Sequence, residues 1–383
     1  MKKFLSVLLV CLLASTLFAA CNKTDSNEIR IGINYELSGG SATYGQGSVE
    51  GIELAIEEIN AAGGINGKLI KPYKVDNSSN IAEATTLATK LITQDKVIAI
   101  LGPATSGCFQ AQIPVANKNK IPVASGSTTA DGVTVAANGK VQEYAFRICF
   151  SDSFQGRVMA NFAAETLSAK NAVIIMDSSS DYGKGLAENF KETFTATGGT
   201  IIAEEAYVKD DTDFNAILTK VKGLSFDVIY IPGYYNEAGL IIKQARNLGI
   251  DTPILGADGF DSPVLVELAG ENALNDIYFT NHYSSLDKDP LVISFIESFN
   301  KKYGKDPDAF NALGYDLAKF VADAVGRAEK LNGESVKNAL EATEAFAGVT
   351  GTLSVDEMHN PIKSIVVIKM ENGKQVSSTK VNP

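Results

Sequence analysis

The chain has 383 residues, of which 45% are hydrophobic and 21% are charged, a globular composition that excludes disorder, collagen and coiled coil. The 45 acidic residues outnumber the 34 basic ones, and the formal net charge of -11 disfavours binding of the folded body to nucleic acids or to anionic membrane surfaces. Two histidines are too few for most multi-histidine metal sites or proton relays, so the composition favours small-molecule binding over catalysis.

The N-terminal segment has the pattern of an export signal. A positive start is followed by a nearly continuous apolar run over residues 4–18, which is too short for a helix that spans a membrane permanently. The small residues directly before Cys21 resemble the bacterial lipobox, which implies a signal peptide over residues 1–20 and a lipid on Cys21. A plain secretory signal with an incidental cysteine is the alternative. The polar residues 21–28 are expected to form the tether between the lipid and the folded part.

From residue 29 onward, short runs rich in Ile and Val alternate with stretches of helical period. The runs predict strands at 29–36, 97–102, 121–125, 171–176, 200–208, 227–233 and 253–258. The stretches predict helices near 48–61, 81–94, 107–119, 154–168, 184–196, 213–222, 236–248, 290–303 and 309–330. Strands that are apolar on both faces and joined by helical crossovers lie parallel in a covered sheet, so we predict a doubly wound α/β fold.

The strand–helix units are more numerous than one sheet comfortably holds, so we expect two sheets. No linker rich in Pro, Ser or Gly separates two halves of the chain. This absence favours a hinged pair of lobes, between which the chain crosses more than once, over two domains joined by one linker.

Signatures of catalysis are weak. Residues 63–69 contain a Gly-Lys pair, but Leu69 stands where a phosphate-binding loop needs Ser or Thr. The glycines of residues 44–51 are one residue too widely spaced for a dinucleotide fingerprint, and no Gly-x-Ser-x-Gly elbow occurs. Cys108 and Cys149, the cysteines expected in the folded part, lack metal-ligand spacing. They could pair after export, although two buried free thiols are the favoured interpretation.

Small polar residues follow two consecutive predicted strands at their carboxyl ends, where open α/β sheets bind ligands. These residues form the loops GPATSG (102–107) and SGSTT (125–129). The hydroxyl groups of each loop could simply cap a helix. Two such loops in succession, however, favour a site that binds a carboxylate group. Tyr182, Tyr234 and Asp258 also fall at strand ends. An aspartate before glycine is usually a turn residue, and its functional alternative is a counter-ion for an ammonium group.

An ordered set of motifs over residues 29–370 resembles the leucine/isoleucine/valine-binding proteins, which are amino-acid receptors of ATP-driven importers. The motifs are GGSATYGQG, GIELAIEEINAAGGINGKLI, VIAILGPATSG, IPVASGST, DYGKGLAENF, VIYIPGYYNEAGLIIKQARNLG, ILGADG and GVTGTLSVDE. The resemblance implies a type I periplasmic binding protein with two Rossmann-like lobes and three hinge crossings, near 147–151, 280–284 and 350–353. Lobe one would contain residues 29–147 and 282–351, and lobe two residues 148–281 and 352–383.

The resemblance also implies roles for individual residues. The positions at which family members hold the ligand carboxylate are occupied here by Ser106, Gly126, Ser127 and Thr128. Positions that bind the ligand ammonium group are matched by Asp258 and Thr128. Positions around the ligand side chain, or that close over it, are matched by Tyr44, Tyr182, Tyr234 and Phe310.

Two departures from the family pattern bear on the ligand. The disulfide that many members have near the carboxylate loop has no counterpart here, because neither VDNSSN nor PATS contains cysteine. Cys108 lies two residues past Ser106, which is unusual for that loop. If its side chain faces the pocket, the preferred ligand could differ from leucine.

The sequence therefore predicts an extracytoplasmic solute-binding lipoprotein that captures an α-amino acid and delivers it to the permease of an ABC transporter. A branched-chain amino acid is the favoured ligand. We expect a monomer that is no enzyme, that has no cofactor, metal or nucleic-acid partner, and that meets the membrane only through the lipid on Cys21. Three alternatives stay open: the same fold with an amide, an aromatic acid or another small polar solute; an exported α/β hydrolase or nucleotide enzyme; and a sensor subunit.

Overall fold

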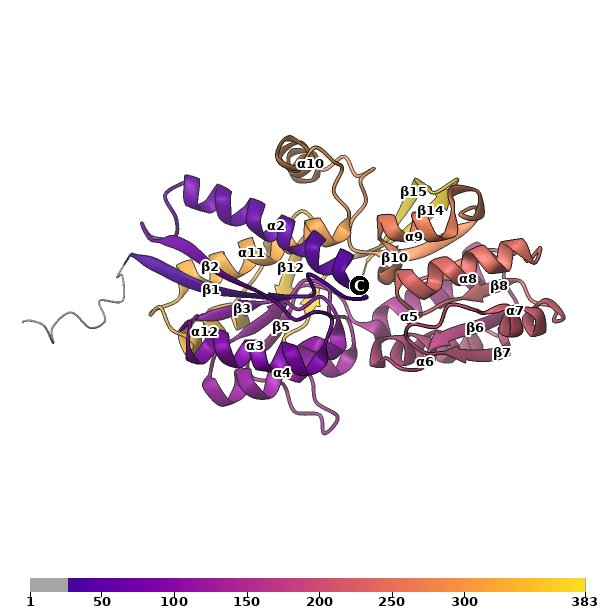
Figure 1. Cartoon of the computed structure of the whole chain (residues 1–383), viewed down its shortest axis with the longest axis horizontal. Helices are drawn as coiled ribbons and strands as arrows, with labels where there is room; N and C mark the ends of the chain where they lie inside the picture. The colour runs from indigo at the N-terminus through magenta and orange to yellow at the C-terminus, as the bar shows by residue number, and fades with distance from the viewer. Residues whose placement is uncertain (1–26, 383) are drawn as a thin grey trace, which may run out of the picture.

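Two large β-sheets, each covered by helices on both faces, organise the chain into two lobes. The structure is a computed structural model that describes residues 27–382. Figure 1 shows the lobes side by side along the long axis of the molecule. The expected signal peptide and Cys21 lie outside the described residues. Glu28, which was expected in the tether, is the first residue of β1.

The first lobe contains a parallel sheet in the order β2-β1-β3-β4-β5. Its strands are β1 (Glu28–Tyr35), β2 (Leu69–Asp76), β3 (Ala99–Leu101), β4 (Val123–Ser125) and β5 (Ala145–Arg147). The covering helices are α2 (Ala42–Ala61), α3 (Ile81–Thr93), α4 (Ser106–Asn119), α11 (Ala309–Arg327) and α12 (Gly333–Glu341).

Alternation along the central strands divides the core of the first lobe into two layers. Leu101 and Ala124 join the apolar cluster that contains the buried faces of α2 and α11. Ile100 and Val123 join the cluster of α3 and α4. Successive side chains of a strand point to opposite faces, so strands that are apolar throughout can fill both layers.

The second lobe contains a mixed sheet in the order β15-β14-β10-β9-β8-β6-β7. Its strands are β6 (Asn171–Asp177), β7 (Thr200–Tyr207), β8 (Val228–Tyr230), β9 (Ile254–Gly256), β10 (Ile277–Asn281), β14 (Ile365–Glu371) and β15 (Lys374–Val381). β14 and β15 are antiparallel to their neighbours and the other strands are parallel. The covering helices are α5 (Asp152–Asn161), α6 (Asp181–Ala196), α7 (Asn215–Lys222), α8 (Tyr235–Asn247) and α9 (Pro263–Ala269).

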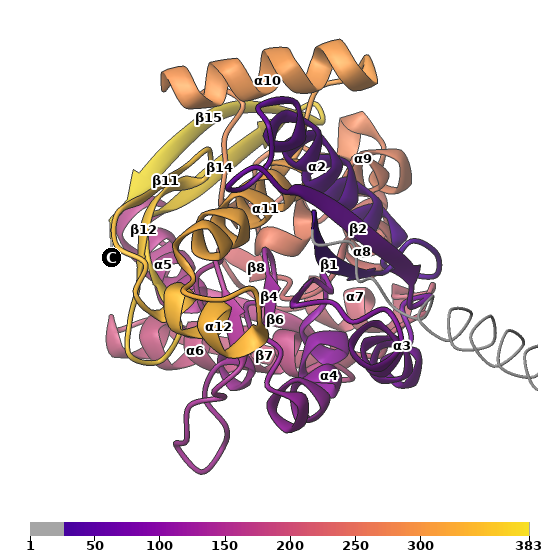
Figure 2. The ribbon, with the colours of Figure 1, turned by 90° about the vertical axis from the view of Figure 1, so that its left-hand side faces the viewer.

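Two of the predicted helices show features that the sequence pattern did not indicate, a π-helical end in one case and a position across the top of another helix in the other. α5 continues into a π-helical turn at Phe162–Thr166, within the predicted helix 154–168. α10 (Pro290–Tyr303) follows the chain's return from the second lobe, and Figure 2 shows it across the top of the molecule above α2. The hydroxyl of Tyr303 donates to the carbonyl of Glu50 at 2.9 Å, which attaches α10 to α2.

The chain passes between the lobes after β5, after β10 and before β14. The predicted third crossing at 350–353 is wrong, because β12 (Gly351–Val355) pairs with β11 (Phe346–Gly348) and β13 (Pro361–Ile362) in a small sheet. The buried carboxylate of Asp316 on α11 accepts hydrogen bonds from the amides of Val349 and Thr350, which holds this sheet against the first lobe. The chain therefore crosses between β13 and β14, and residues 352–362 pack with the first lobe.

Several strands were missed by the sequence pattern, among them the edge strand β2, the interior strand β10 and the C-terminal hairpin of β14 and β15. In β2 only one residue, Ile70, is buried, and Pro72 interrupts the run. Proline is tolerated there because an edge strand pairs on one side only. β14 and β15 were missed because they form an antiparallel hairpin after the last helix, outside the strand–helix alternation used for prediction.

Candidate functional site

The loops that follow β3 and β4 form the wall of the site in the first lobe. α4 begins at Ser106, so the first amide groups of this helix have no acceptor within it. The hydroxyl oxygen of Ser106 accepts a hydrogen bond from the amide of Ala130 at 3.2 Å, which joins the two loops. Its own proton stays available for a ligand acceptor. The hydroxyl of Ser127 donates to the carbonyl of Ala104 at 2.9 Å, so its oxygen can accept.

Glu36, the last residue of the first predicted strand, supports this wall and was missed by sequence reasoning. Its carboxylate accepts hydrogen bonds from the amides of Ala104 and Thr105 at 2.9 and 3.1 Å and from the Thr105 hydroxyl at 2.6 Å. Burial raises the pKa of Glu36, and these donors oppose the shift. An acidic residue directly after a run of buried strand residues was the available signal.

Thr128 is fully buried, and no hydrogen-bond partner of its hydroxyl exists among the described residues. Buried hydroxyl groups are rarely left unpaired, so this atom calls for a partner that the protein itself does not supply. At Gly126, a Cβ atom would lie 3.1 Å from the Cβ atom of Leu313 on α11, and the predicted contact of this residue with the ligand carboxylate stays a prediction. Gly126 thus allows close packing of the loop on this helix.

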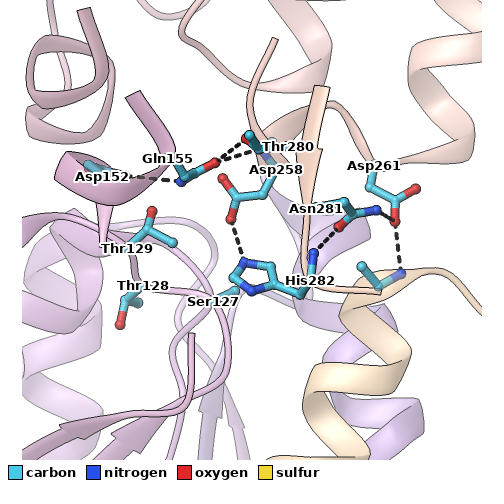
Figure 3. A network of polar contacts seen from close by, with 12 residues as sticks. Ser127, Thr128, Thr129, Asp152, Gln155, Asp258, Asp261, Thr280, Asn281 and His282 are labelled. Carbon is cyan, nitrogen blue, oxygen red and sulfur yellow. Dashed lines mark hydrogen bonds and ion pairs between the residues drawn. The ribbon is translucent and has the colours of Figure 1, made fainter. Parts of the chain in front are cut away.

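Asp258 forms the opposite wall, in the second lobe. It follows β9, begins the short 3-10 helix η4 (Asp258–Phe260), and its side chain is buried. The hydroxyl of Tyr182 donates to one carboxylate oxygen at 2.7 Å, and Nε2 of His282 lies 3.1 Å from the other. Figure 3 shows His282 between Asp258 and the loop that carries Ser127 and Thr128. His282 was not predicted as a site residue.

The four predicted aromatic residues gather between these walls. Tyr182 and Tyr234 stack with ring centroids 4.9 Å apart, and Tyr44 and Phe310 stack at 4.2 Å. Tyr44 meets Tyr234 edge to face at 5.7 Å. Burial raises the pKa of all three tyrosines well above their ordinary value, so their phenol groups stay neutral.

Seven of the nine predicted ligand-binding residues line one small cavity between the lobes. The cavity is small, because the space between its lining atoms amounts to only about 230 Å³. Gly126 and Thr128 are not among the lining residues. Asp258 is the single charged residue of the lining, which consists of Tyr44, Ala104, Ser106, Ser127, Tyr182, Tyr234, Asp258, Gly259 and Phe310.

Direct contacts between the lobes close the mouth of the cleft. The hydroxyl of Tyr44 donates to the carbonyl of Gly259 and accepts a hydrogen bond from the amide of Tyr235 at 3.3 Å. The side chains of Tyr235 and Asn236 both donate to the carbonyl of Gly40, at 3.1 and 2.7 Å. The structure is thus a closed arrangement of the two lobes.

Neither Cys108 nor Cys149 lines this cavity. Cys108 and Cys149 are both buried and free, and burial raises the pKa of each thiol to about 12. Cys108 lines an adjoining part of the cleft and not the cavity. Over residues 27–382 no group of His, Cys, Asp and Glu side chains could hold a metal ion.

The family model of the periplasmic binding proteins matches residues 28–375, nearly the whole described chain. The chain belongs to this family. This periplasmic binding protein also resembles curated relatives. The leucine-, isoleucine-, valine-, threonine- and alanine-binding protein of Pseudomonas aeruginosa is 28% identical over 333 residues, which are 87% of each chain.

Solved structures of periplasmic binding proteins match along almost the entire chain. The branched-chain amino acid transporter substrate binding protein LivJ from Streptococcus pneumoniae, in complex with isoleucine, is 44% identical, with 93% of this chain and 100% of that chain covered and a TM-score of 0.88. The leucine binding protein LivK from Thermotoga maritima is 36% identical, with 93% and 99% covered and a TM-score of 0.87. The predicted family and the predicted two-lobed α/β fold are therefore confirmed.

Other structures share the fold at greater distance. A solute binding protein from R. palustris in complex with benzoate has a TM-score of 0.82 at 24% identity, with 93% of this chain and 96% of that chain covered. In the part of the chain that is described, no helix is both long and apolar enough to cross a membrane.

Proposed function

We propose that this periplasmic binding protein captures an α-amino acid, with a branched-chain side chain, between its two lobes. The observation that carries the proposal is the placement of Ser106 and Asp258 on opposite walls of one closed cavity. A zwitterionic ligand has a carboxylate for the wall that contains Ser106 and an ammonium group for the wall that contains Asp258. The relatives that bind leucine, isoleucine or valine support the same ligand class.

The first lobe would bind the ligand carboxylate without a cationic side chain. No Lys or Arg lines the cavity, so the donors are the Ser106 hydroxyl and the free amide groups at the start of α4. Hydrogen bonds to an ionised acceptor are stronger than those between neutral groups, and a helix N-terminus favours negative charge. Thr128 does not line the cavity, and the family resemblance together with its unpaired hydroxyl is the ground on which we propose it as a further donor to the carboxylate.

The second lobe would bind the ammonium group and complete the apolar wall. Asp258 supplies the counter-charge, without which a buried ammonium group would be costly. The rings of Tyr44, Tyr182, Tyr234 and Phe310, which pack against one another, would enclose the apolar side chain of the ligand. Discrimination among leucine, isoleucine and valine would be modest, since one methylene group is worth only about 1–3 kcal/mol.

Ligand binding would favour closure of the lobes because each lobe supplies part of the site. A ligand that contacts both walls binds the closed state better than the open one and shifts the population toward it. A membrane permease can distinguish these two shapes. We therefore propose delivery to an ABC permease by a monomer without catalytic activity, held at the cell envelope by a lipid on Cys21.

A calorimetric ligand panel tests the proposed function. The mature chain from residue 21, with Cys21→Ser to prevent lipidation, is titrated with leucine, isoleucine, valine, glutamine and benzoate. We expect saturable binding of the three branched-chain amino acids and weaker or no binding of the other two compounds. Tighter binding of benzoate than of every amino acid would instead assign the cavity to an aromatic acid.

A further inference from the structure

His282 lies where two of the three crossings between the lobes meet. It follows β10 directly, and its side chain is buried. Its ring stacks on Phe150 of the first crossing, with ring centroids 3.7 Å apart and an angle of 13° between the planes. His282 is therefore packed into the hinge and does not line the ligand cavity.

The same side chain contacts the carboxylate of Asp258. Nε2 of His282 lies 3.1 Å from Oδ2, and the Tyr182 hydroxyl donates to Oδ1 at 2.7 Å. Gln155 supports the backbone nearby, because its Oε1 accepts from the Asp258 amide at 3.1 Å and from the Thr280 hydroxyl at 2.7 Å (Figure 3). Two donors on two different oxygens fix the plane of the carboxylate.

The imidazole carries no charge that would compete with a ligand. Burial lowers the pKa of His282 to about 4, although the Asp258 carboxylate opposes this shift, and the cation of Lys363 lowers the pKa further. A neutral imidazole next to a carboxylate keeps its proton on the facing nitrogen, here Nε2, and donates it. The negative charge of Asp258 is then left for a cation in the cavity. Nδ1 has no hydrogen-bond partner among the described residues.

We propose that His282 is a positioning residue for ammonium recognition, which orients the Asp258 carboxylate through Nε2–H and attaches the charged end of the ligand to the hinge. The inference rests on the proposed function. It extends the ammonium site from one aspartate to the triad Tyr182–Asp258–His282, in which only Asp258 and Tyr182 line the cavity. The residue acts on the ligand only through Asp258.

The test compares two ligands that differ at the ammonium group. L-leucine and (S)-2-hydroxy-4-methylpentanoic acid are titrated by calorimetry into the wild-type chain, His282→Gln and His282→Met. Met has a similar volume but no donor, so we expect about tenfold weaker leucine binding and little change for the hydroxy acid. Gln can donate from its amide, so it should retain leucine affinity within about threefold. The ratio of the two affinities is the readout.

His359 provides a matched control. It is also buried, its ring stacks on Phe146 at 4.2 Å and 12°, and its Nε2 lies 3.0 Å from the carboxylate of Glu341. It does not line the cavity. His359→Met should change the melting temperature and leave the ratio of the two affinities unchanged.

The outcomes separate this inference from the proposed function. A wild-type chain that binds no α-amino acid overturns both. If the wild type binds leucine but His282→Met weakens both ligands equally, His282 acts on closure in general and the inference fails. It also fails if His282→Gln loses as much leucine affinity as His282→Met. Should His282→Met not fold, His282→Asn replaces it, because the shorter amide does not reach Asp258.

Discussion

The hydroxyl group of Tyr44, in the first lobe, donates a hydrogen bond to the carbonyl oxygen of Gly259 in the second lobe. Gly259 directly follows Asp258, and Tyr44 stacks on Phe310, so this bond connects the proposed ammonium site with the opposite aromatic wall. One side chain thus both lines the cavity and joins the lobes. Ligand affinity should depend on such contacts because they form part of the closed state.

Tyr44→Phe removes both hydrogen bonds that this hydroxyl makes between the lobes, to the Gly259 carbonyl and from the Tyr235 amide, while the ring and its stacking on Phe310 are kept. A typical hydrogen bond contributes about 0.5–1.5 kcal/mol, so the loss of two should lower leucine affinity by roughly 5- to 150-fold in calorimetry. Tyr303→Phe is the control, because it also removes a hydroxyl that donates to a backbone carbonyl, but away from the cavity. Equal leucine affinities in wild type and Tyr44→Phe would refute the role of these bonds.

Asp258→Ala should cost leucine binding about 2–5 kcal/mol, because the ammonium group would be buried without its counter-ion. Calorimetry measures the loss, and circular dichroism shows whether the variant is folded. Asp181→Ala is the control, because the side chain of Asp181 is 64% exposed and does not line the cavity. Unchanged leucine binding in Asp258→Ala would exclude an α-amino acid held in the proposed orientation.

Thr128→Val tests whether the unpaired hydroxyl serves the ligand. Valine has nearly the same shape as threonine. Because the substitution removes an unsatisfied buried hydroxyl, the unfolding free energy of the ligand-free protein should increase by about 0–2 kcal/mol. Leucine affinity should fall at the same time. Thr129→Val is the control, because the Thr129 hydroxyl is likewise buried and unpaired but was not predicted to bind the ligand. Equal effects of both variants on leucine affinity would contradict the role of Thr128.

The contribution of His282 to the stability of the protein should decrease on acidification. In the unfolded chain this imidazole takes up a proton near its ordinary pKa of 6.5, whereas in the folded protein the pKa is about 4. Between these values the unfolded state binds more protons than the folded state. The unfolding free energy therefore decreases as the pH is lowered from about 6.5 to about 4, by up to about 3 kcal/mol. Asp308, with its pKa raised to about 7 by burial, acts in the opposite sense.

The effect of His282 is therefore measured as the difference between wild type and variant in the loss of unfolding free energy on acidification. Urea unfolding of wild type and His282→Gln is compared at pH 7 and pH 4.5, so that Asp308 and the other acidic groups that do not contact His282 contribute equally to both proteins. The wild type should lose more stability than the variant. Parallel loss in the two proteins would show that His282 does not titrate as described.

Much of the fold followed from local patterns. The apolar strands and the helices of amphipathic period are local properties, and two glycine-, serine- and threonine-rich loops after consecutive strands marked one wall of the site. Seven of the predicted residues line the cavity, including Ser106 and Asp258. The third crossing escaped prediction because its position depends on Asp316 binding the amides of Val349 and Thr350, a contact between distant segments.

By itself, the sequence determined the α/β class and the membership of the family, and it predicted the hydroxyl-rich loops and a distant aspartate as parts of one site. These features are carried by periodicity and by motifs that are each contiguous in the chain. Only the tertiary structure decided that Tyr44 contacts Gly259 and that His282 holds Asp258. Closure of two lobes brings together residues more than 200 positions apart in one case, and burial in the hinge makes a histidine neutral in the other. Neither effect can be recognised from a local sequence pattern.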